Sequence, residues 1–135
     1  MEVMPFLNVI ISTQPSPDLA RTIAAGLTER TVRILGKPAE LISVAVGFVP
    51  REHWIVAGRS LAEHGRSSFW LDIKVTDSTN TKDEKARFLG EVFGFMQEVL
   101  GPLHQESYIL VHDVRADAYG YGGETQERRY VRARL

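Results

Sequence analysis

The side chains that could carry out chemistry include two charged residues in an alternating segment. Asp72 and Lys74 are interleaved with three apolar residues, so both point to the same face of an expected strand. This pattern predicts either an ion pair that faces a pocket or a subunit interface, or a solvated sheet face. Lys74 is also a candidate for binding a carboxylate, because its ammonium group can pair with an anion.

The histidines give no metal site. The four histidines, His53, His64, His104 and His112, show no spacing typical of metal ligands. The chain has no cysteine, which excludes thiolate metal sites, disulfides and thiol nucleophiles. His112 and Asp113 are neighbours in an expected strand and point to opposite faces, which favours packing over acid–base work. We therefore expect no metal ion.

Two other segments resemble anion sites only in part. Gly120–Gly123 lacks the lysine and the following helix of a phosphate loop. The tail from Arg128 to Arg134 holds four arginines, but 16 basic residues against 17 acidic ones leave a net charge of −1. This balance favours a solvated edge or a strip of intersubunit salt bridges, and we expect no nucleic-acid partner.

The length and composition are those of one globular domain. A chain of 135 residues with 44% hydrophobic and 24% charged residues suffices for a single core. The apolar run at 5–11 is too short to span a membrane and lacks the basic flank of a signal peptide. We expect a soluble cytoplasmic protein without a membrane partner.

The first half predicts a strand, a helix and a second strand. The apolar run at 6–11 indicates a short buried strand before a turn. Ser16 is a suitable helix cap, Pro17 suits the first helical position, and Gly36 ends the apolar stripe. Alternating apolar residues within 41–49 then predict a strand.

The second half predicts the same order of elements. Alternation within 70–76 indicates a strand, and Thr81 with Glu84 forms a capping-box spacing before a helix that ends at Gly101. The segment 108–113 is the matching last strand.

An offset of 65 residues superimposes these two sets of elements without a gap. It aligns Leu35-Gly36 with Leu100-Gly101, and we interpret the chain as a single domain over 1–135 with tandem β-α-β repeats at 5–69 and 70–135. The expected fold is α/β, with a four-stranded mixed sheet and both helices on one face. The other face still carries apolar side chains, which predicts an oligomer.

The segment Met4-Pro5-Phe6-Leu7-Asn8-Val9 and the turn Gly36-Lys37-Pro38, with the duplicated β-α-β plan, resemble the tautomerase superfamily. Its members include 4-oxalocrotonate tautomerase and macrophage migration inhibitory factor (MIF). The resemblance implies a homotrimer with pockets at subunit interfaces, and an amino-terminal proline as the catalytic base.

Pro5 is the residue that matches this proline. An α-amino group has a pKa of about 7.7 to 8.0, and an apolar pocket near cations lowers it, so a neutral amine can move a proton at pH 7. In the sequence given, Met1–Met4 precedes Pro5, whose nitrogen is then a tertiary amide and no base. We expect translation to start at Met4; otherwise Pro5 is an ordinary edge-strand proline without this chemistry.

The resemblance also implies roles for other residues. Lys37 matches a lysine that contacts the substrate carboxylate, although a lysine there would also complement the helix dipole. Tyr108 matches a tyrosine that a neighbouring subunit contributes and that donates to a carbonyl, although strand tyrosines are often packing residues.

Two aromatic-glycine segments, 53–58 and 118–123, resemble the hairpin whose aromatic side chain walls the site in 4-oxalocrotonate tautomerase. Trp54 and Tyr119 are the aromatic residues concerned, and a hairpin at a subunit interface is the alternative interpretation. The two arginines that hold a dicarboxylate in that enzyme are replaced by Pro15 and Ser43, so a dicarboxylate substrate is not expected.

We therefore expect enol–keto tautomerisation of a small 2-oxo acid, without a cofactor, because the carbonyl itself is the electron sink. Two alternatives remain open. The same proline could act as an acid in hydration, dehalogenation or decarboxylation of a three-carbon acid, or the chain could be a non-catalytic trimeric binding protein.

Overall fold

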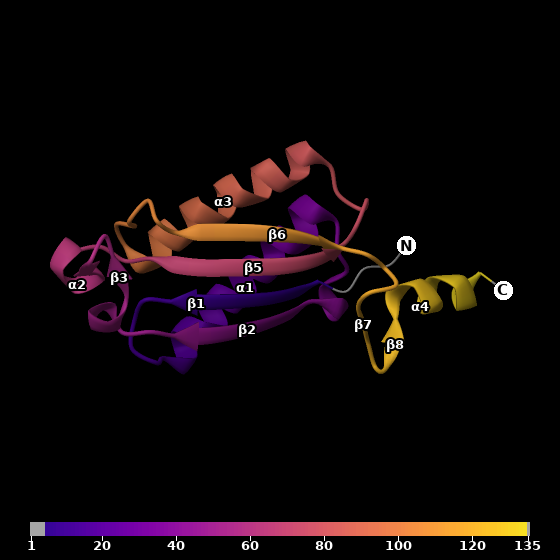
Figure 1. Cartoon of the computed structure of the whole chain (residues 1–135), viewed down its shortest axis with the longest axis horizontal. Coiled ribbons are helices and arrows are strands. Elements are labelled where there is room, and N and C mark those ends of the chain that lie inside the picture. The colour runs from indigo at the N-terminus through magenta and orange to yellow at the C-terminus, as the bar shows by residue number, and fades with distance from the viewer. Residues whose placement is uncertain (1–4, 135) are drawn as a thin grey trace.

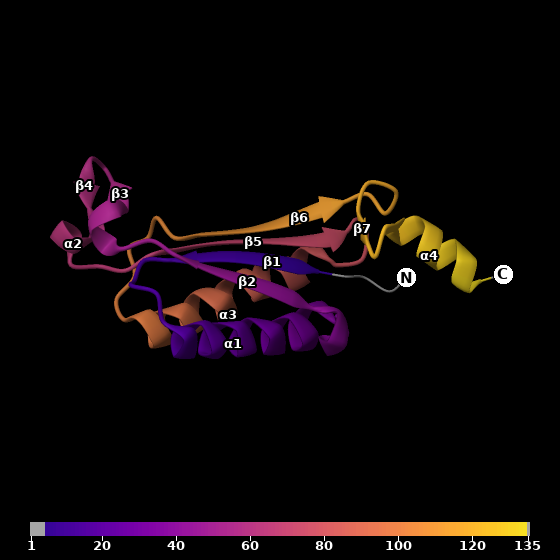
Figure 2. The same ribbon diagram turned by 90° about the horizontal axis from the view of Figure 1, so that it is seen from below.

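The protein is built on one four-stranded sheet with two long helices against one face (Figures 1 and 2). The structure is a computed structural model that describes residues 5–134. Its main elements are β1 (Phe6–Ile11), α1 (Pro17–Leu35), β2 (Ser43–Phe48), β5 (Phe69–Thr76), α3 (Lys82–Leu100) and β6 (Tyr108–Val114). The predicted fold class and the order of its elements are confirmed.

The strands are ordered β2-β1-β5-β6, with one reversal of direction in the middle. Within each repeat the two strands are parallel, whereas β1 and β5 run antiparallel, with Phe6 opposite Lys74 and Ile11 opposite Phe69. The head of β1 therefore lies at one end of the sheet and the head of β5 at the other.

The two helices begin and end where the capping residues predict. The Ser16 hydroxyl accepts from the Leu19 amide at 3.2 Å, and Gly36 closes α1 in the left-handed conformation with φ 70°. Thr81 and Glu84 exchange the two bonds of a capping box at the start of α3.

The core lies between the helices and one face of the sheet. The odd-numbered residues of β1 and β5 point into it and meet the apolar stripes of both helices. The fully buried members are Leu7, Val9, Ile11, Ile23, Leu27, Phe69, Leu71, Ile73, Val75, Phe88, Val92 and Met96.

The other face of the sheet carries a mixture of charged and apolar side chains. Lys74 donates to the Asp72 carboxylate there, which confirms that both residues share one face. Phe6, Trp70 and Tyr108 lie on the same face and are 45%, 37% and 50% exposed in the protomer. The two long helices cover only the opposite face (Figure 2), so this face is open in the protomer.

A short hairpin and helix follow the second long strand of each repeat, at opposite ends of the sheet (Figure 1). The first set is β3 (Ile55–Val56), β4 (Arg59–Ser60) and α2 (Leu61–His64), and the second is β7 (Gly120–Tyr121), β8 (Glu124–Thr125) and α4 (Gln126–Ala133). Single 3-10 turns occupy Ala39–Leu41 and Arg51–His53. None of the described helices is both long and apolar enough to cross a membrane.

The structure differs from the sequence analysis at two points. Phe6 pairs with Ser43 and Trp70 with Tyr108, so the first strands of the two repeats correspond at an offset of 64, one fewer than the later elements. An offset of 65 would align each residue of β1 with a residue of β5 that points to the opposite face of the sheet. The arginine-rich tail is helix α4, whose start was missed; Thr125 caps it by accepting from the Arg128 amide at 3.0 Å.

Candidate functional site

Pro5 lies at the head of β1, at the end of the sheet that also carries β7, β8 and α4 (Figure 1). It is buried, and its carbonyl accepts from the Ser43 amide at 3.3 Å, which anchors it beside β2. The predicted extension at 1–4 lies outside the described residues. We call this end of the sheet the proline end; it comprises Pro5, Lys37, Lys74, Thr76, Thr79 and Tyr119.

Lys37 is turned inward at this end rather than toward the carbonyls that end α1. Its side chain is almost fully buried, with only 3% of the residue exposed, and Nζ donates to Thr79 Oγ1 at 3.1 Å. Burial lowers the pKa of Lys37 to about 8, while the carboxylates of Glu84 and Asp113 act in the opposite direction. The amine is therefore still largely protonated at pH 7.

Tyr119 reaches the same end from the segment before β7. Its hydroxyl lies 2.8 Å from Oγ1 of the buried Thr76, at the end of β5. Thr79 Oγ1 in turn donates to the Thr76 carbonyl at 2.6 Å. One turn, 76–79, thus holds both Lys37 and Tyr119, and sequence reasoning missed Thr76 and Thr79 because short hydroxyl side chains in a polar turn carry no distinctive spacing.

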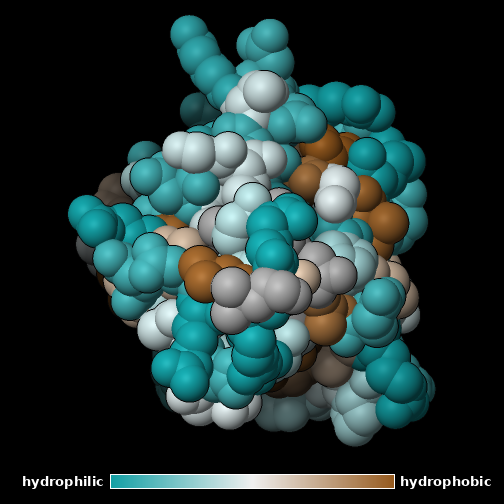
Figure 3. Space-filling view, turned by 90° about the vertical axis from the view of Figure 1, so that its right-hand side faces the viewer, coloured by the Kyte–Doolittle hydropathy of each residue, from teal (hydrophilic) through white to brown (hydrophobic). Residues whose placement is uncertain are grey.

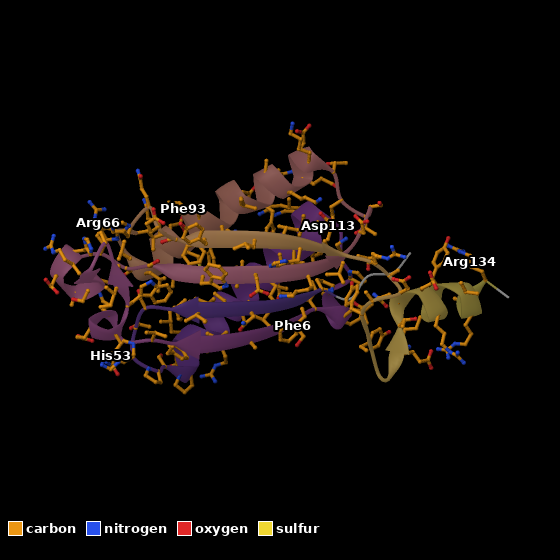
Figure 4. The ribbon with its side chains drawn as sticks, in the orientation of Figure 1. Phe6, His53, Arg66, Phe93, Asp113 and Arg134 are labelled. Carbon is orange, nitrogen blue, oxygen red and sulfur yellow. The ribbon has the colours of Figure 1, made fainter. Side chains whose placement is uncertain are left out.

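Lys74 stands on the open face directly opposite Phe6, the residue after Pro5. Its ammonium group is paired with Asp72, and His112 is its neighbour on β6. Figure 4 shows Phe6 on the open sheet, and Figure 3, which faces the proline end, shows mostly hydrophilic residues with apolar patches between them. The structure therefore brings four predicted residues to the proline end: Pro5, Lys37, Lys74 and Tyr119.

Trp54 and Tyr108 lie at the opposite end of the sheet, where Figure 4 labels His53. With Trp70, Glu106, His104 and the hairpin residues 55–57 they line a cavity of about 520 Å³, which we call the aromatic cavity. Trp54 and Tyr119, which the sequence analysis assigned to the same pocket wall, therefore lie at opposite ends of the sheet within one protomer. A site that uses all six predicted residues needs a second copy of the chain.

The Tyr108 hydroxyl already has an acceptor in the protomer. It donates to Oε2 of Glu106, and this bond to a carboxylate raises the pKa of Tyr108. A phenol has a single proton to donate. Tyr108 can therefore donate to a substrate carbonyl only after its bond to Glu106 is broken.

Both the sequence and the fold of this chain are similar to those of known proteins. The family model described as Tautomerase enzyme matches residues 5–64, beginning at Pro5. No curated protein matches the chain significantly.

Several solved structures share the fold over almost the whole chain. A native fused 4-OT is 22% identical with a TM-score of 0.78, over 91% of this chain and 97% of its own. A fused 4-OT described as a wild-type asymmetric trimer is 19% identical with a TM-score of 0.79, over 93% and 98%. A MIF-like protein from Entamoeba histolytica is 17% identical with a TM-score of 0.73, over 90% and 98%.

Proposed function

We propose that this chain, which resembles the tautomerase superfamily in its fold and in the sequence of its first repeat, catalyses enol–keto tautomerisation of a small 2-oxo acid. The observation that carries the proposal is the proline end. A proline that aligns with the start of the family match stands at the head of β1, at the end of the sheet where a buried cationic lysine also lies. The proposal requires that Pro5 be the mature amino terminus.

The proton is moved by Pro5. As a neutral secondary amine its nitrogen takes the proton from the enol hydroxyl, the carbonyl forms, and the same proton returns to the carbon at the other end of the enol. No bond to the protein forms, and the substrate and product are isomers. Apolar surroundings and nearby positive charge would keep this amine neutral at pH 7.

The two lysines of the proline end supply the positive charge that a 2-oxo acid requires. Lys37 and Lys74 would bind the carboxylate and stabilise the developing enolate, because fixed charges act strongly where water is excluded. Lys37 is the better placed of the two for this role, since Lys74 already pairs with Asp72. Tyr119 would form part of the apolar wall next to Pro5.

Trp54 and Tyr108 enter this proposal only through a second subunit. They lie at the far end of their own protomer, so a homotrimer in which the aromatic cavity of one subunit faces the proline end of the next would complete the site. The open sheet face and the trimeric form of a fused 4-OT of the same fold support such an assembly.

Ketonisation of phenylenolpyruvate tests the proposal directly. We expect activity from protein that begins at Pro5 and none above buffer from the form that begins at Met1, which has no free amine at the site. Pro5→Ala in the Pro5-first protein should be much less active, because a primary amine replaces the secondary amine of the proline ring. Equal inactivity of all three proteins would remove the tautomerase assignment.

Covalent labelling gives a second readout that does not depend on turnover. The reagent 2-oxo-3-pentynoate, which inactivated Pt0534, a protein of similar fold, carries an alkyne conjugated to a ketone. A neutral amine adds to the alkyne carbon distal to the carbonyl, and the proton passes to the adjacent carbon, so no group is lost. Peptide mass spectrometry should find this adduct on Pro5 of the Pro5-first protein and not on the Met1 form.

One observation favours a second candidate, a non-catalytic trimeric binding protein. In the sequence given, Pro5 is preceded by Met1–Met4, which makes its nitrogen an amide. Mass spectrometry of the protein from its native host decides this point, because an intact Met1 terminus is incompatible with the proline base.

A further inference from the structure

A second cavity, of about 510 Å³, lies beside the end of α3. We call it the helix-side cavity, and its lining residues come from α3 and from two loops: Arg66, Phe93, Gln97, Leu103, His104 and Gln105. We propose that it binds a small monocarboxylate with an apolar body, of the arylacetate class. The inference goes beyond the proposed tautomerase function, because none of these residues belongs to the proline end.

The helix-side cavity and the aromatic cavity lie on different faces of the sheet. Trp70 and Tyr108 of the aromatic cavity stand on the open face, whereas Phe93 and Gln97 belong to α3, which packs on the covered face (Figure 2). Among the described residues, the two linings share only His104. The proposed trimer assembles through the open face and would therefore leave the helix-side cavity accessible.

Phe93 and Leu103 form the apolar part of the lining. Leu103 is 5% exposed, and the ring centroid of Phe93 lies 6.3 Å from that of the buried Phe69, with the planes tilted by 52°. Both residues are thus held by the core. An apolar group placed against them leaves water, which stabilises the complex. The lining therefore favours a ligand with an apolar body over a small inorganic anion.

Arg66 supplies a positive charge at the rim of the cavity. Figure 4 labels Arg66 and Phe93 at the end of the sheet away from α4. The Arg66 guanidinium is exposed and has neither an ion pair nor a hydrogen bond within residues 5–134. A guanidinium presents a planar fork of N–H donors that matches the two oxygens of a carboxylate. Arg66 is therefore free to form a bidentate pair with a bound acid.

The other polar residues of the lining can also donate hydrogen bonds. His104 Nδ1 accepts from the Glu106 amide at 3.0 Å, so the ring proton of the neutral imidazole is on Nε2. The side-chain amides of Gln97 and Gln105 add further N–H donors. No aspartate or glutamate is among the described residues of this lining, so no carboxylate there repels an acid.

Hydrogen bonds between the two loops hold the cavity in shape. The Ser67 amide donates to the Pro102 carbonyl at 3.0 Å, and the His104 amide donates to the Ser67 carbonyl at 2.8 Å. The Ser67 hydroxyl donates to the Leu100 carbonyl at 3.1 Å. A cavity that is formed before binding loses little conformational freedom when a ligand enters.

The side-chain amides of Gln97 and Gln105 give a local reporter for this site. We would titrate the isotope-labelled full Met1 form with phenylacetate and follow these two amides in proton–nitrogen correlation spectra. Phenylacetamide, which has the ring without the charge, is the matched neutral ligand. Acetate, which has the charge without the ring, tests the apolar contact, and sodium chloride at equal ionic strength is the blank.

We expect phenylacetate to shift both amide signals saturably and to bind on the order of tenfold more tightly than phenylacetamide or acetate. Arg66→Gln should weaken phenylacetate binding about tenfold. Arg128→Gln, the same change at an exposed arginine of α4, should leave binding unchanged. Lys37→Met, which removes a charge from the proline end, should also leave the two shifts unchanged. Circular dichroism and thermal unfolding establish that the variants are folded.

The proposal is overturned if phenylacetate gives no saturable shift, or if phenylacetamide or the Arg66→Gln variant binds equally well, because Arg66 then does not recognise the charge. Equal binding of acetate would reduce the cavity to a surface anion contact. Loss of both shifts in Lys37→Met would assign the ligand to the proline end instead. Because the Met1 form is used, in which Pro5 is acylated, failure of the tautomerase assignment would leave this result untouched.

Discussion

At the scale of single residues, Lys37 and Tyr108 show how surroundings change what a side chain can do. Lys37 is a buried amine whose pKa is lowered to about 8 and whose Nζ has Thr79 as hydrogen-bond partner. Tyr108 is half exposed and bound to Glu106. The sequence was enough to select Lys37 and Tyr108 as candidate residues. It did not predict their hydrogen bonds to Thr79 and Glu106, because those two residues belong to no recognisable motif.

Lys37→Met should weaken binding of an anionic substrate to the Pro5-first enzyme. The ammonium form is lost as the pH rises through about 8, so KM of the wild type should rise above that pH. The variant should have a KM on the order of tenfold higher at pH 7 and lack this alkaline rise. Steady-state kinetics between pH 6 and 9.5 would measure both effects on KM. This range extends about 1.5 to 2 units on either side of the pKa. An unchanged KM would show that Lys37 does not bind the carboxylate.

The same pKa predicts how stability depends on pH. Because the folded pKa of Lys37 lies below the ordinary 10.5, the unfolded chain binds more protons between about 8 and 10.5. The free energy of unfolding should therefore rise with pH in this window for the wild type relative to Lys37→Met. Urea unfolding at several pH values tests the sign, and a difference that falls with pH would contradict it.

In Thr79→Val, the rise of KM at alkaline pH should begin about half a pH unit to one unit lower than in the wild type. The valine removes the acceptor of the Lys37 ammonium group, so burial is no longer offset by this bond. Thr79→Ser keeps the hydroxyl and should restore the wild-type profile. Identical profiles in all three proteins would mean that Thr79 does not position Lys37.

At the scale of elements, the hairpin β7–β8 determines where Tyr119 lies. A Cβ atom on Gly120 would stand 1.8 Å from the Glu124 carbonyl oxygen, so no larger residue fits without moving the hairpin. The aromatic-glycine pattern predicted this hairpin from the sequence. Its effect on Tyr119 required the structure, because the contact to Thr76 joins residues 43 positions apart.

Gly120→Ala should destabilise the protein by about 1 to 3 kcal/mol and reduce kcat/KM of the Pro5-first enzyme. The reason is that the hairpin must shift and take Tyr119 away from Thr76. Gly94→Ala is the matched control: Gly94 lies in α3 with open space around it, and the change should stabilise by about 0.5 to 1 kcal/mol. Wild-type stability and activity in Gly120→Ala would show that the close approach to Glu124 is not needed.

At the scale of the whole molecule, the proposed function depends on more than one copy of the chain, because one sheet face is open and the predicted site residues lie at two ends of the sheet. Leu110 lies on this face beside Asp72, with the Asp72–Lys74 ion pair at its centre. In a homotrimer built on this face these side chains would be removed from water. The assembly would also bring Trp54 and Tyr108 of one subunit to the Pro5 of another.

Leu110→Glu should convert the oligomer to monomers, because it places a second carboxylate beside Asp72 on the face to be buried. Sedimentation velocity should find a trimer for the wild type and a single chain for the variant. Leu89→Glu, on the exposed side of α3, should remain trimeric. A wild-type protein that sediments as a monomer would contradict both the oligomer and the shared site.

Local patterns in the sequence were enough to predict the long strands and helices and the faces that they bury. Caps such as Ser16 and Thr81 and the alternation around Asp72 and Lys74 act within a few residues, so local physics is enough to predict them. Helix α4 was not predicted, because the segment after its cap, Thr125, is too rich in charged residues to show an apolar stripe.

Which of the predicted residues lie near one another depends on how the two repeats pair. Since β1 and β5 run antiparallel, the heads of the two repeats point to opposite ends of the sheet, and residues with similar expected roles are separated. Lys37 and Tyr119 therefore meet the turn 76–79 at the same end of the sheet as Pro5, while Trp54 and Tyr108 line a cavity with Trp70 and Glu106 at the other end. The direction of strand pairing between repeats depends on contacts between distant segments, which no local pattern in the chain records.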